Sequence, residues 1–385
     1  MRTAKLKDIT LTITDGKHGD CKNHDDSGYY FISCKDVYDE TIHYENARQI
    51  TEDDFRDADR RTNLAAYDIL ITNSGTIGRM ALVKDIPETR KTTFQKSVAI
   101  VRADTSQVVP NYLYYLLKSK VHDFINSSNG SAQKNLLLST MRDFDISFVD
   151  SFETQHRIAT ILSRYDSLIE NYQKQIKLLE EAAQRLYKEW FVDFHFPGHE
   201  TTKIVDGVPE GWTPSQLGQL AEFKRGKTIT KKDVIDGDIP VVAGGLEPAY
   251  YCNKSNTAER VITISGSGAN AGFTRMYFEK VWASDCSFVD ASITPFLHFV
   301  YCFLKDNKTT IDNLQKGAAQ PHVYAKDINA MSICIPIESV LTSFEGKASK
   351  YFDTISSFQS QIRLLTEARD RLLPKLMSGE INVES

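Results

Sequence analysis

The sequence has few cysteines and no long apolar run. Its 385 residues contain six cysteines, and no two of them form a CxxC pair. This scatter is typical of reduced thiols in a cytosol rather than of a disulfide framework. No stretch approaches the ~20 consecutive apolar residues of a membrane span, and the first residues lack the apolar core of a signal peptide. We therefore expect a cytoplasmic protein without a membrane span.

An excess of one charge is also missing. Lys and Arg number 46 against 51 Asp and Glu, which gives a net charge of −5. This balance argues mildly against a strongly basic nucleic-acid binder, although a basic face on a near-neutral domain is still compatible with DNA. The 25% charged and 41% hydrophobic fractions exclude a wholly disordered chain. At roughly 150 residues per domain, the length predicts two or three domains.

Motifs of several enzyme classes are absent as well. Residues 225–228 (RGKT) look like the end of a P-loop, but the glycine required five positions before Gly226 is Ala221. Residues 266–268 form only a lone GxG, and there is no methyltransferase (N/D)PP(Y/F), GxSxG or HExxH motif. The sequence therefore predicts a recognition and scaffolding protein with no catalytic residues, metal or cofactor of its own. One group of residues has the side-chain types that bind metals: His18, Cys21, His24 and Cys34. We interpret these four as unrelated side chains rather than as a metal site.

What the sequence does contain is an internal repeat with a period of about 186 residues. Residues 178–182 (LLEEA) recur as 364–368 (LLTEA), and Arg-Leu follows at the same distance in both copies. A period this long indicates a duplicated half-protein rather than a solenoid. Apolar residues at alternating steps of four and three form an unbroken heptad stripe in the first copy, and the second copy repeats it.

These stripes predict two paired helices of about 35 residues, each about 50 Å long, and the two-fold symmetry of the repeat predicts an antiparallel coiled coil. Two core helices of separate domains are the alternative. The first helix is expected to end before Pro197, and Pro374 to kink or end the second. Arg369 stands where the first copy has Ala183, which predicts a local polar contact. The predicted seam residues are Ile158, Leu162, Tyr165, Ile169, Tyr172, Ile176, Leu179, Leu186, Trp190, Phe344, Tyr351, Ile355, Phe358, Ile362, Leu365 and Leu372.

The segments that precede the two helices predict similar β-rich domains, so the expected fold class is α+β in a pseudo-two-fold repeat. Apolar runs bounded by turn residues predict strands and short helices. The spacing of matching residues indicates about 23 extra residues in the first domain, between positions 20 and 68. Strands are predicted at 68–72, 97–101, 261–264 and 332–335, and short helices at 110–119 and 295–305. The predicted boundaries are 1–150 for the first domain, 151–195 for the first long helix, 196–213 for a linker, 214–335 for the second domain and 336–385 for the second long helix.

Matching loops and basic clusters give the candidate binding residues. Gly16 matches Gly226, the glycine-containing loop 73–78 matches 265–272, and 130–133 matches 317–320. Basic residues interleaved with Thr, Gln and Asn suit phosphate contacts and hydrogen bonds to groove edges, whereas a solvated loop is the alternative for each cluster. The residues predicted to contact DNA are Arg60, Arg61, Ser74, Thr76, Arg79, Lys91, Gln95, Lys96, Gln133, Lys134 and Asn135 in the first domain, and Lys224, Arg225, Lys227, Lys231, Lys232, Asn270, Arg275, Gln320 and His322 in the second.

Together these features resemble the specificity subunit of a Type I restriction–modification system. The resemblance covers essentially the whole chain, as two unlike domains that are each followed by a repeated long helix. Local strings support it: QHRIA at 155–159, YKEWF at 187–191, PEGW at 209–212 and LLPKLMSGEI at 372–381. The last string is the most specific.

The resemblance implies the function of each part. Each β-rich domain would be a target recognition domain that reads one half of a split double-stranded DNA sequence, and the coiled coil would set the spacing. The unequal domains suggest an asymmetric target. Two methyltransferase subunits that bind S-adenosylmethionine would dock on this frame, and restriction subunits that use ATP and Mg²⁺ would join them in phage defence. Two alternatives remain: a related Type II system (IIB/IIG-like) whose partner fuses methylation and cleavage, and a coiled-coil scaffold that binds proteins and no nucleic acid.

Overall fold

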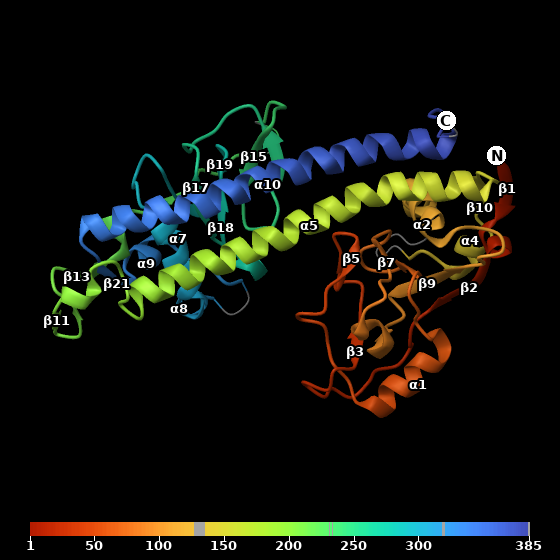
Figure 1. Ribbon diagram of the computed structural model, residues 1–385, viewed down its shortest axis with the longest axis horizontal. Coiled ribbons are helices and arrows are strands. Elements are labelled where there is room, and N and C mark those ends of the chain that lie inside the picture. Colours follow the sequence, from red (N-terminus) through yellow and green to blue (C-terminus); the bar gives the residue numbers. More distant parts are fainter. Residues whose placement is uncertain (127–134, 231, 233, 318–319, 384–385) are drawn as a thin grey trace. The chain divides into compact units, whose positions relative to one another are not determined.

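A computed structural model describes residues 1–126, 135–230, 232, 234–317 and 320–383. The chain divides into two compact units. Unit 1 comprises Met1–Ile169 and Arg363–Ser385, and unit 2 comprises Glu170–Ile362. The long helices α5 (Phe152–Phe191) and α10 (Glu338–Ser378) contribute residues to both units (Figure 1). None of the helices in the described residues is long and apolar enough to cross a membrane.

Unit 1 is built on an antiparallel four-stranded sheet with the strand order β2-β9-β6-β7. β1 pairs with β10, β4 with β5 in a short hairpin, and β3 with β8 in parallel. The elements are β1 (Arg2–Lys5), η1 (Leu6–Ile9), β2 (Thr10–Asp15), β3 (Tyr30–Ile32), β4 (Val37–Tyr38), β5 (Thr41–Ile42), α1 (Glu52–Thr62), β6 (Ile69–Thr72), β7 (Met80–Leu82), η2 (Pro87–Lys91), β8 (Thr92–Phe94), β9 (Val98–Ala103), α2 (Pro110–Ser119), α3 (Val121–Asn126), α4 (Leu138–Arg142) and β10 (Asp145–Phe148).

Unit 2 is built on a second antiparallel four-stranded sheet, with the order β14-β20-β17-β18. β13 pairs with β21, and β15 pairs with β19 in parallel. The elements are η3 (His199–Thr201), β11 (Ile204–Val205), β12 (Val208–Pro209), β13 (Thr213–Gln216), α6 (Leu217–Leu220), β14 (Lys224–Arg225), β15 (Ile239–Val242), β16 (Tyr250–Cys252), β17 (Val261–Ser265), η5 (Gly268–Asn270), β18 (Thr274–Tyr277), β19 (Trp282–Ala283), β20 (Cys286–Asp290), α7 (Leu297–Asp306), α8 (Lys308–Asn313), α9 (Ala325–Asn329) and β21 (Ser332–Ile335).

Unit 2 therefore repeats the topology of unit 1. Each unit has the same four-stranded sheet order, the same antiparallel pair of first and last strands, and one parallel strand pair. Unit 1 adds β4, β5 and α1 between β3 and β6, inside the segment where the repeat spacing indicated extra residues. The predicted α+β fold with two repeated domains is confirmed.

The helices α5 and α10 pack together and run antiparallel. In unit 2 the rings of Tyr172 and Phe358 stack with centroids 4.8 Å apart, and Trp190 packs on Phe344 at 5.9 Å, so numbers fall along α10 as they rise along α5. The predicted seam residues are all at least half buried. Near their ends the helices also bury residues outside the seam, such as Tyr187, against the domain of the same unit.

The second helix was expected to kink or end at Pro374, and it does not end there. α10 continues to Ser378 with Pro374 inside it. The neighbouring side chains of Leu373, Leu376 and Met377 are buried in the apolar cluster of unit 1, and this packing stabilises the last turn although proline removes one backbone hydrogen bond. The helices have 40 and 41 residues and are longer than the predicted 35 or so. α5 ends at Phe191, before Pro197, as expected.

Candidate nucleic-acid interface

One end of the four-stranded sheet brings several unit 1 segments together. β2 ends at Asp15, β6 ends at Thr72, and β9 begins beside them at Val98. In the loop after β6, the Asn73 N–H donates to the Ser97 carbonyl oxygen (3.0 Å), and the Asn73 carbonyl oxygen accepts from the N–H of Leu136 (2.8 Å). The next residue along, Ser74, forms a β-bridge with Asn135. A glycine-containing loop and a distant segment are thus joined at this sheet end.

The same backbone connections recur in unit 2. The Gly266 N–H donates to the Asp285 carbonyl oxygen (3.1 Å), and the Gly266 carbonyl oxygen accepts from the N–H of Val323 (3.1 Å). Ser267 forms a β-bridge with His322, as Ser74 does with Asn135. We call these two equivalent regions the sheet ends of units 1 and 2. They are one backbone framework built twice.

Two matching glycines make this framework possible. A Cβ atom on Gly16 would lie 1.9 Å from the Phe94 carbonyl oxygen, and one on Gly226 would lie 2.3 Å from the Ser284 carbonyl oxygen. Each distance is far shorter than a non-bonded contact between real atoms, so only glycine lets the chain just after β2 and β14 pass this close to another backbone segment. The glycine match found in the sequence therefore has a steric cause.

The side chains on the two sheet ends differ. Asp15, Ser97 and Asn135 in unit 1 take the places of residues that line a small pocket of about 40 Å³ in unit 2. That pocket combines the Arg225 guanidinium, an acidic side chain and two rings, with the His322 and Tyr324 rings stacked at 5.9 Å between centroids. Hydrogen-bond donors, an acceptor and aromatic surface are the groups that read base edges. The lining residues are Arg225, Gly266, Asp285, Cys286, Ser287, His322, Val323, Tyr324 and Ala325.

The pocket contains no activated nucleophile among the described residues that line it. Burial raises the pKa of the Cys286 thiol to about 12, so the thiol is neutral at physiological pH. The Ser267 hydroxyl beside the pocket donates a hydrogen bond to the Asp285 carboxylate. These groups suit recognition rather than covalent chemistry.

In unit 1 the extra segment covers part of the sheet end. Arg61 in α1 donates to the Asp15 carboxylate (2.7 Å) and to the Asp15 carbonyl oxygen (3.0 Å). Lys17, the residue after Gly16, bonds to Asp57 of α1 (3.0 Å), and this hydrogen bond raises the Lys17 pKa. The extra segment therefore gives the first sheet end a different charge and a different outline.

Comparison with known proteins assigns this architecture. The family model for the Type I restriction modification DNA specificity domain matches the chain twice, at residues 2–181 and 209–372. The chain belongs to the Type I restriction–modification specificity family. It is a specificity subunit, which is a non-catalytic component of such a system and carries two target recognition domains.

Individual relatives agree with this assignment. The Type I restriction enzyme MjaIX specificity subunit of Methanocaldococcus jannaschii is 31% identical over 343 residues, which cover 82% of this chain and 78% of that protein. The HindI specificity subunit of Haemophilus influenzae is 22% identical over 370 residues, covering 73% and 80%. Among solved structures, the S subunit from M. genitalium has a similar fold, with a TM-score of 0.59, 17% identity and coverage of 98% and 96%.

Gln155, in the first of the strings that carry the resemblance, has a structural role in this specificity subunit. Its side chain is fully buried at the start of α5. The amide oxygen accepts from the Val109 N–H at the start of α2 (2.8 Å), and the amide nitrogen donates to the Val149 carbonyl oxygen (2.7 Å). Gln155 thus fastens the first recognition domain to α5 through backbone groups.

Most of the predicted DNA-contact residues lie at or next to the two sheet ends, and their roles stay predictions. Arg275 on β18 is held within its own domain, since it donates to the Leu246 carbonyl oxygen (2.8 Å). Lys91 lies at the start of β8, at the end of that strand away from Gln95. Arg60 is exposed on α1, and Lys232 is exposed beyond β14. Three predicted residues lie outside the described residues: Gln133, Lys134 and Lys231. The residues brought to the sheet ends or beside them are Arg61, Ser74, Thr76, Arg79, Gln95, Lys96 and Asn135 in unit 1, and Lys224, Arg225, Lys227, Asn270, Gln320 and His322 in unit 2.

Sequence reasoning missed several residues at the same places. Asp15 immediately precedes Gly16, as Arg225 precedes Gly226, so the glycine match could have identified both. Ser267, Asp285 and Tyr324 become neighbours of Arg225 and His322 only through folding, and no sequence pattern marks them.

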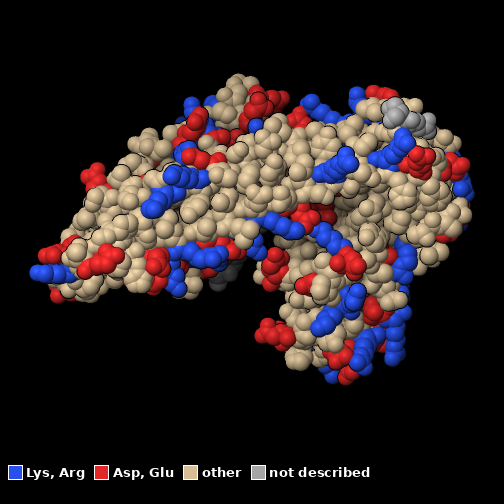
Figure 2. All heavy atoms as spheres, in the orientation of Figure 1, with Lys and Arg blue, Asp and Glu red and all other residues tan. Residues whose placement is uncertain are grey.

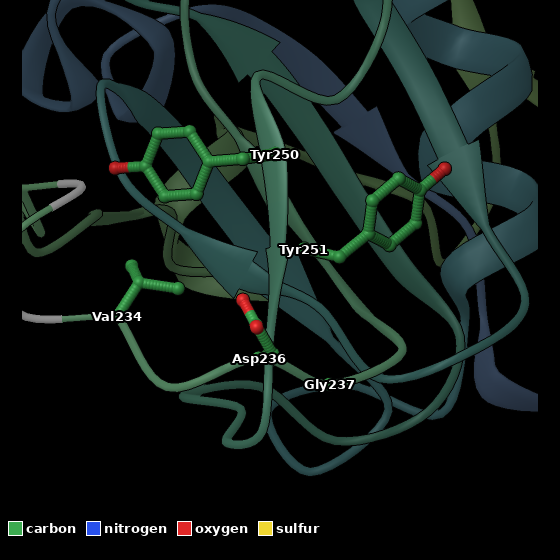
Figure 3. Close-up of a pocket in the computed structure, with 5 residues that line it drawn as sticks. All are labelled: Val234, Asp236, Gly237, Tyr250 and Tyr251. Carbon is green, nitrogen blue, oxygen red and sulfur yellow. The ribbon is translucent and has the colours of Figure 1, made fainter.

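The other candidate sites carry less chemistry. A hollow of about 380 Å³ at the β15–β16 hairpin is lined by Val234, Asp236, Gly237, Tyr250 and Tyr251 (Figure 3). Of these described lining residues only Asp236 is charged, and its negative charge opposes a phosphate backbone. The described residues contain no group of three or more His, Cys, Asp or Glu side chains arranged for a metal, and all six cysteines are free thiols.

The surface charge on the drawn face is mixed. On the face drawn in Figure 2, Lys and Arg alternate with Asp and Glu in both units, also over α1. The near-neutral composition of the subunit thus reflects mixed charges with local clusters.

Proposed function

We propose that each recognition domain reads one half of a split DNA sequence with its sheet end, and that α5 and α10 set the distance between the halves. In this proposal the phosphate contacts of basic residues position the subunit, and side chains of the sheet ends specify bases. Two methyltransferase subunits dock on the helices, and restriction subunits join that complex. The catalytic groups and their cofactors belong to these partners.

One observation carries the proposal. The two sheet ends share their backbone hydrogen bonds and close glycine contacts, whereas the side chains that they present differ. Asp15 occupies the position in the repeat that is equivalent to Arg225, and Asn135 the position equivalent to His322. A repeated framework with unlike side chains suits two recognition tasks of one kind, and an asymmetric target follows from it.

The direct test is the pattern of DNA methylation in cells that carry this subunit and its methyltransferase partner. We expect one asymmetric motif made of two short half-sites with a fixed gap. With the purified complex we expect a duplex DNA shift that weakens as salt rises, because phosphate contacts release counterions. A well-folded complex that shifts no duplex at any salt concentration would instead support a protein-binding scaffold.

We expect Arg225→Ala to weaken recognition of the second half-site alone. The guanidinium is exposed at the unit 2 sheet end, where it lines the pocket with Asp285 and His322. A good bidentate contact with a base is worth about 1–3 kcal/mol, so methylation should fall roughly tenfold or more, or spread to other bases at one position. Sequencing of methylated sites measures both effects.

Lys280→Ala is the matched control for this variant. Lys280 is exposed just after β18, whose last residue, Tyr277, pairs with Val261 at the end of the sheet away from Ser265. The control removes the same charge from the same domain and should leave the motif and its methylation level unchanged. Equal effects of the two substitutions would show that charge in general, rather than the sheet end, supports recognition.

The methyltransferase partner should dock on two exposed leucines. Leu178 on α5 and Leu364 on α10 are 59% and 54% exposed, and they occupy equivalent places in the repeat. Equivalent apolar side chains on equivalent helices suit two copies of one partner. Because a buried leucine contributes about 1.5–3 kcal/mol, Leu178→Glu should weaken binding of one copy at least tenfold, and the change at both leucines should prevent binding of both copies.

The mass of the complex in analytical ultracentrifugation measures how many copies bind. Gln173 and Gln359 provide the control, because they are also exposed, also repeat-related and on the same two helices. Changing both to glutamate adds the same charges without removing a leucine, and two copies should still bind. If the leucine variants bind two copies as well, the docking surface lies elsewhere.

A further inference from the structure

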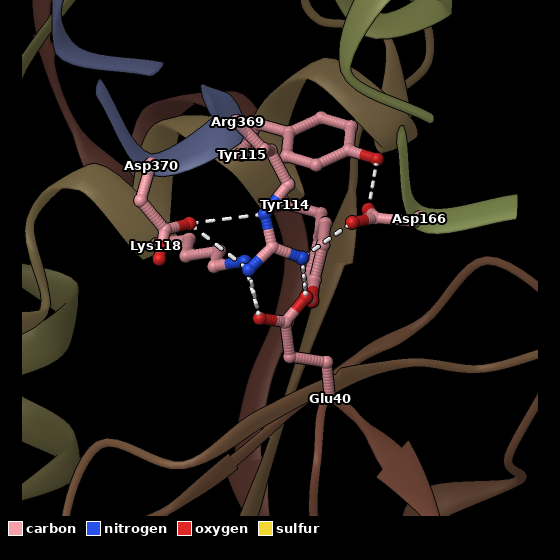
Figure 4. Close-up of polar contacts among 7 residues, drawn as sticks. All are labelled: Glu40, Tyr114, Tyr115, Lys118, Asp166, Arg369 and Asp370. Carbon is pink, nitrogen blue, oxygen red and sulfur yellow. Dashed lines mark hydrogen bonds and ion pairs between the residues drawn. The ribbon is translucent and has the colours of Figure 1, made fainter. Parts of the chain in front are cut away.

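A buried arginine joins three acidic side chains in unit 1 (Figure 4). The Arg369 guanidinium on α10 donates two hydrogen bonds to the Glu40 carboxylate, at 2.7 and 2.8 Å. It also bonds to Asp166 of α5 (2.5 Å) and to the neighbouring Asp370 (3.0 Å). Lys118 of α2 reaches the same Glu40 carboxylate (2.5 Å). Glu40 and Asp166 therefore meet α10 at one guanidinium, and α2 joins the cluster through Glu40.

The cluster is shielded from water at its centre. The Arg369 side chain is 6% exposed, against 32% for Glu40 and 27% for Asp166. Burial lowers the pKa of Arg369, but the surrounding carboxylates outweigh it and raise the pKa overall, so the charge is retained. Tyr115 of α2 donates a hydrogen bond to Asp166 and closes one side of the cluster. The planar fork of arginine suits such a set of contacts better than a lysine would.

Glu40 reaches the cluster from a tight turn in the extra segment. Val37 pairs with Ile42 and Tyr38 with Thr41, which leaves Asp39 and Glu40 as a two-residue hairpin turn. Both turn residues have positive φ, at 46° and 61°. This turn geometry is common for Asn and Gly and uncommon for glutamate. The contacts of Glu40 to Arg369 and Lys118 hold the hairpin against α10 and α2.

The equivalent position in unit 2 is apolar. Ala183, Phe352 and Cys302 take the places of Arg369, Asp166 and Tyr115 in the repeat, and each is at most 2% exposed within one apolar cluster. At these three positions unit 2 therefore has apolar packing where unit 1 has ionic contacts. The charged cluster is specific to the copy that carries the extra segment.

We propose that Arg369 and Glu40 are positioning residues, which fix the orientation of the first recognition domain on α5 and α10 and thereby restrict the half-site gap that the subunit accepts. This inference rests on the proposed function, because it assumes that the domain reads a half-site. Neither residue needs to contact DNA. A domain whose orientation on α5 and α10 varies can contact its half-site at more than one gap length, even though the side chains that contact bases are unchanged.

The test is methylation mapping with Glu40→Gln, Arg369→Ala and the control Asp39→Asn. Glu40→Gln keeps the size of the side chain and removes its charge, while Arg369→Ala introduces the residue found at the equivalent position 183. Asp39→Asn removes a charge from the same turn and suits its positive φ. For both cluster variants we expect methylation at sites with a gap one base pair shorter or longer to rise about tenfold, or about 1.4 kcal/mol, with both half-sites unchanged. The control should keep the wild-type gap.

Three outcomes would overturn the inference. In the first, methylation falls at all sites together with an unchanged gap, which is the result of a merely structural role. In the second, Glu40→Gln behaves as Asp39→Asn does; since Glu40 lies on a surface turn, this comparison decides even if Arg369→Ala fails to fold. In the third, amide exchange at 37–42 in the isolated chain is the same with and without Glu40→Gln. A wild-type subunit that directs no split-motif methylation is a separate result, because it contradicts the proposed function itself.

Discussion

Insertion of one heptad into each long helix is expected to lengthen the gap of the methylated motif and leave both half-sites unchanged. Duplicating residues 172–178 and 352–358 places the new segments opposite each other, because Tyr172 stacks on Phe358 there. Seven residues preserve the apolar phase and add about 10 Å, which corresponds to up to about three base pairs at ~3.4 Å each. Three base pairs also rotate one half-site by roughly 100°, so we expect a lower level of methylation at the new motif.

Insertions that break the helix pairing provide the controls. Three residues added at the same places shift the seam out of phase, and a heptad in α5 alone leaves it without a partner segment in α10. Both changes should reduce folding, seen as a lower melting temperature, and should remove methylation rather than move it. A subunit with the full double insertion that is well folded and methylates sites with the old gap would rule out the helices as the spacer.

The elements that sequence patterns predict are those decided by local repetition. The heptad stripe predicts which side of each helix is buried, as at Leu162 and Ile355, and the two-fold repeat predicts that the helices pair antiparallel. Local rules fail where packing outweighs them. Pro374 is a helix breaker by its own chemistry, but buried neighbours such as Leu376 keep its turn helical.

The candidate interface divides in the same way. Gly16 and Gly226 could be matched from the sequence because only glycine tolerates such a close approach of two backbone segments. Which side chains gather around them could not be predicted, because Asp285 and Tyr324 reach Arg225 only through the sheet and the β-bridge of His322. For Arg369 the sequence indicated a polar contact, which is present. Its partner Glu40 lies 329 positions away in a segment without a repeat copy, and no pattern connects the two.

Replacing residues 1–150 by the corresponding domain of another specificity subunit is expected to change the first half-site completely and the second not at all. The junction suits such an exchange. The strands β1 and β10 pair with each other inside the replaced segment, and Gln155 of α5 bonds to backbone groups of Val109 and Val149, which any donor domain supplies. Methylation mapping before and after the exchange reads the two half-sites separately. A change in both would contradict modular recognition.

The ionic cluster adds a condition to this exchange. Glu40, Tyr115 and Lys118 leave with the replaced domain, while Asp166 and Arg369 remain on the helices. A donor without an acid at the position of Glu40 leaves the guanidinium buried with fewer partners. The cost should lie between the roughly 0–1 kcal/mol of an exposed ion pair and the about 3–5 kcal/mol of a fully buried one, because Glu40 is 32% exposed. Such chimeras should have a lower melting temperature and should methylate sites with a wider range of half-site gaps.

Arg369→Ala made within the chimera should restore both properties, although the same substitution harms the parent. In the parent, Arg369→Ala removes the cation that the carboxylates of Glu40 and Asp166 contact. In a chimera whose donor has no acid at the position of Glu40, the substitution removes a cation that already lacks its main partner. Because Arg369→Ala is expected to have opposite effects in the parent and in the chimera, the comparison separates the interaction of residue 369 with the exchanged domain from any general effect on α10. If the substitution lowers the melting temperature equally in parent and chimera, Arg369 stabilises α10 alone, and compatibility between domain and helices has another origin.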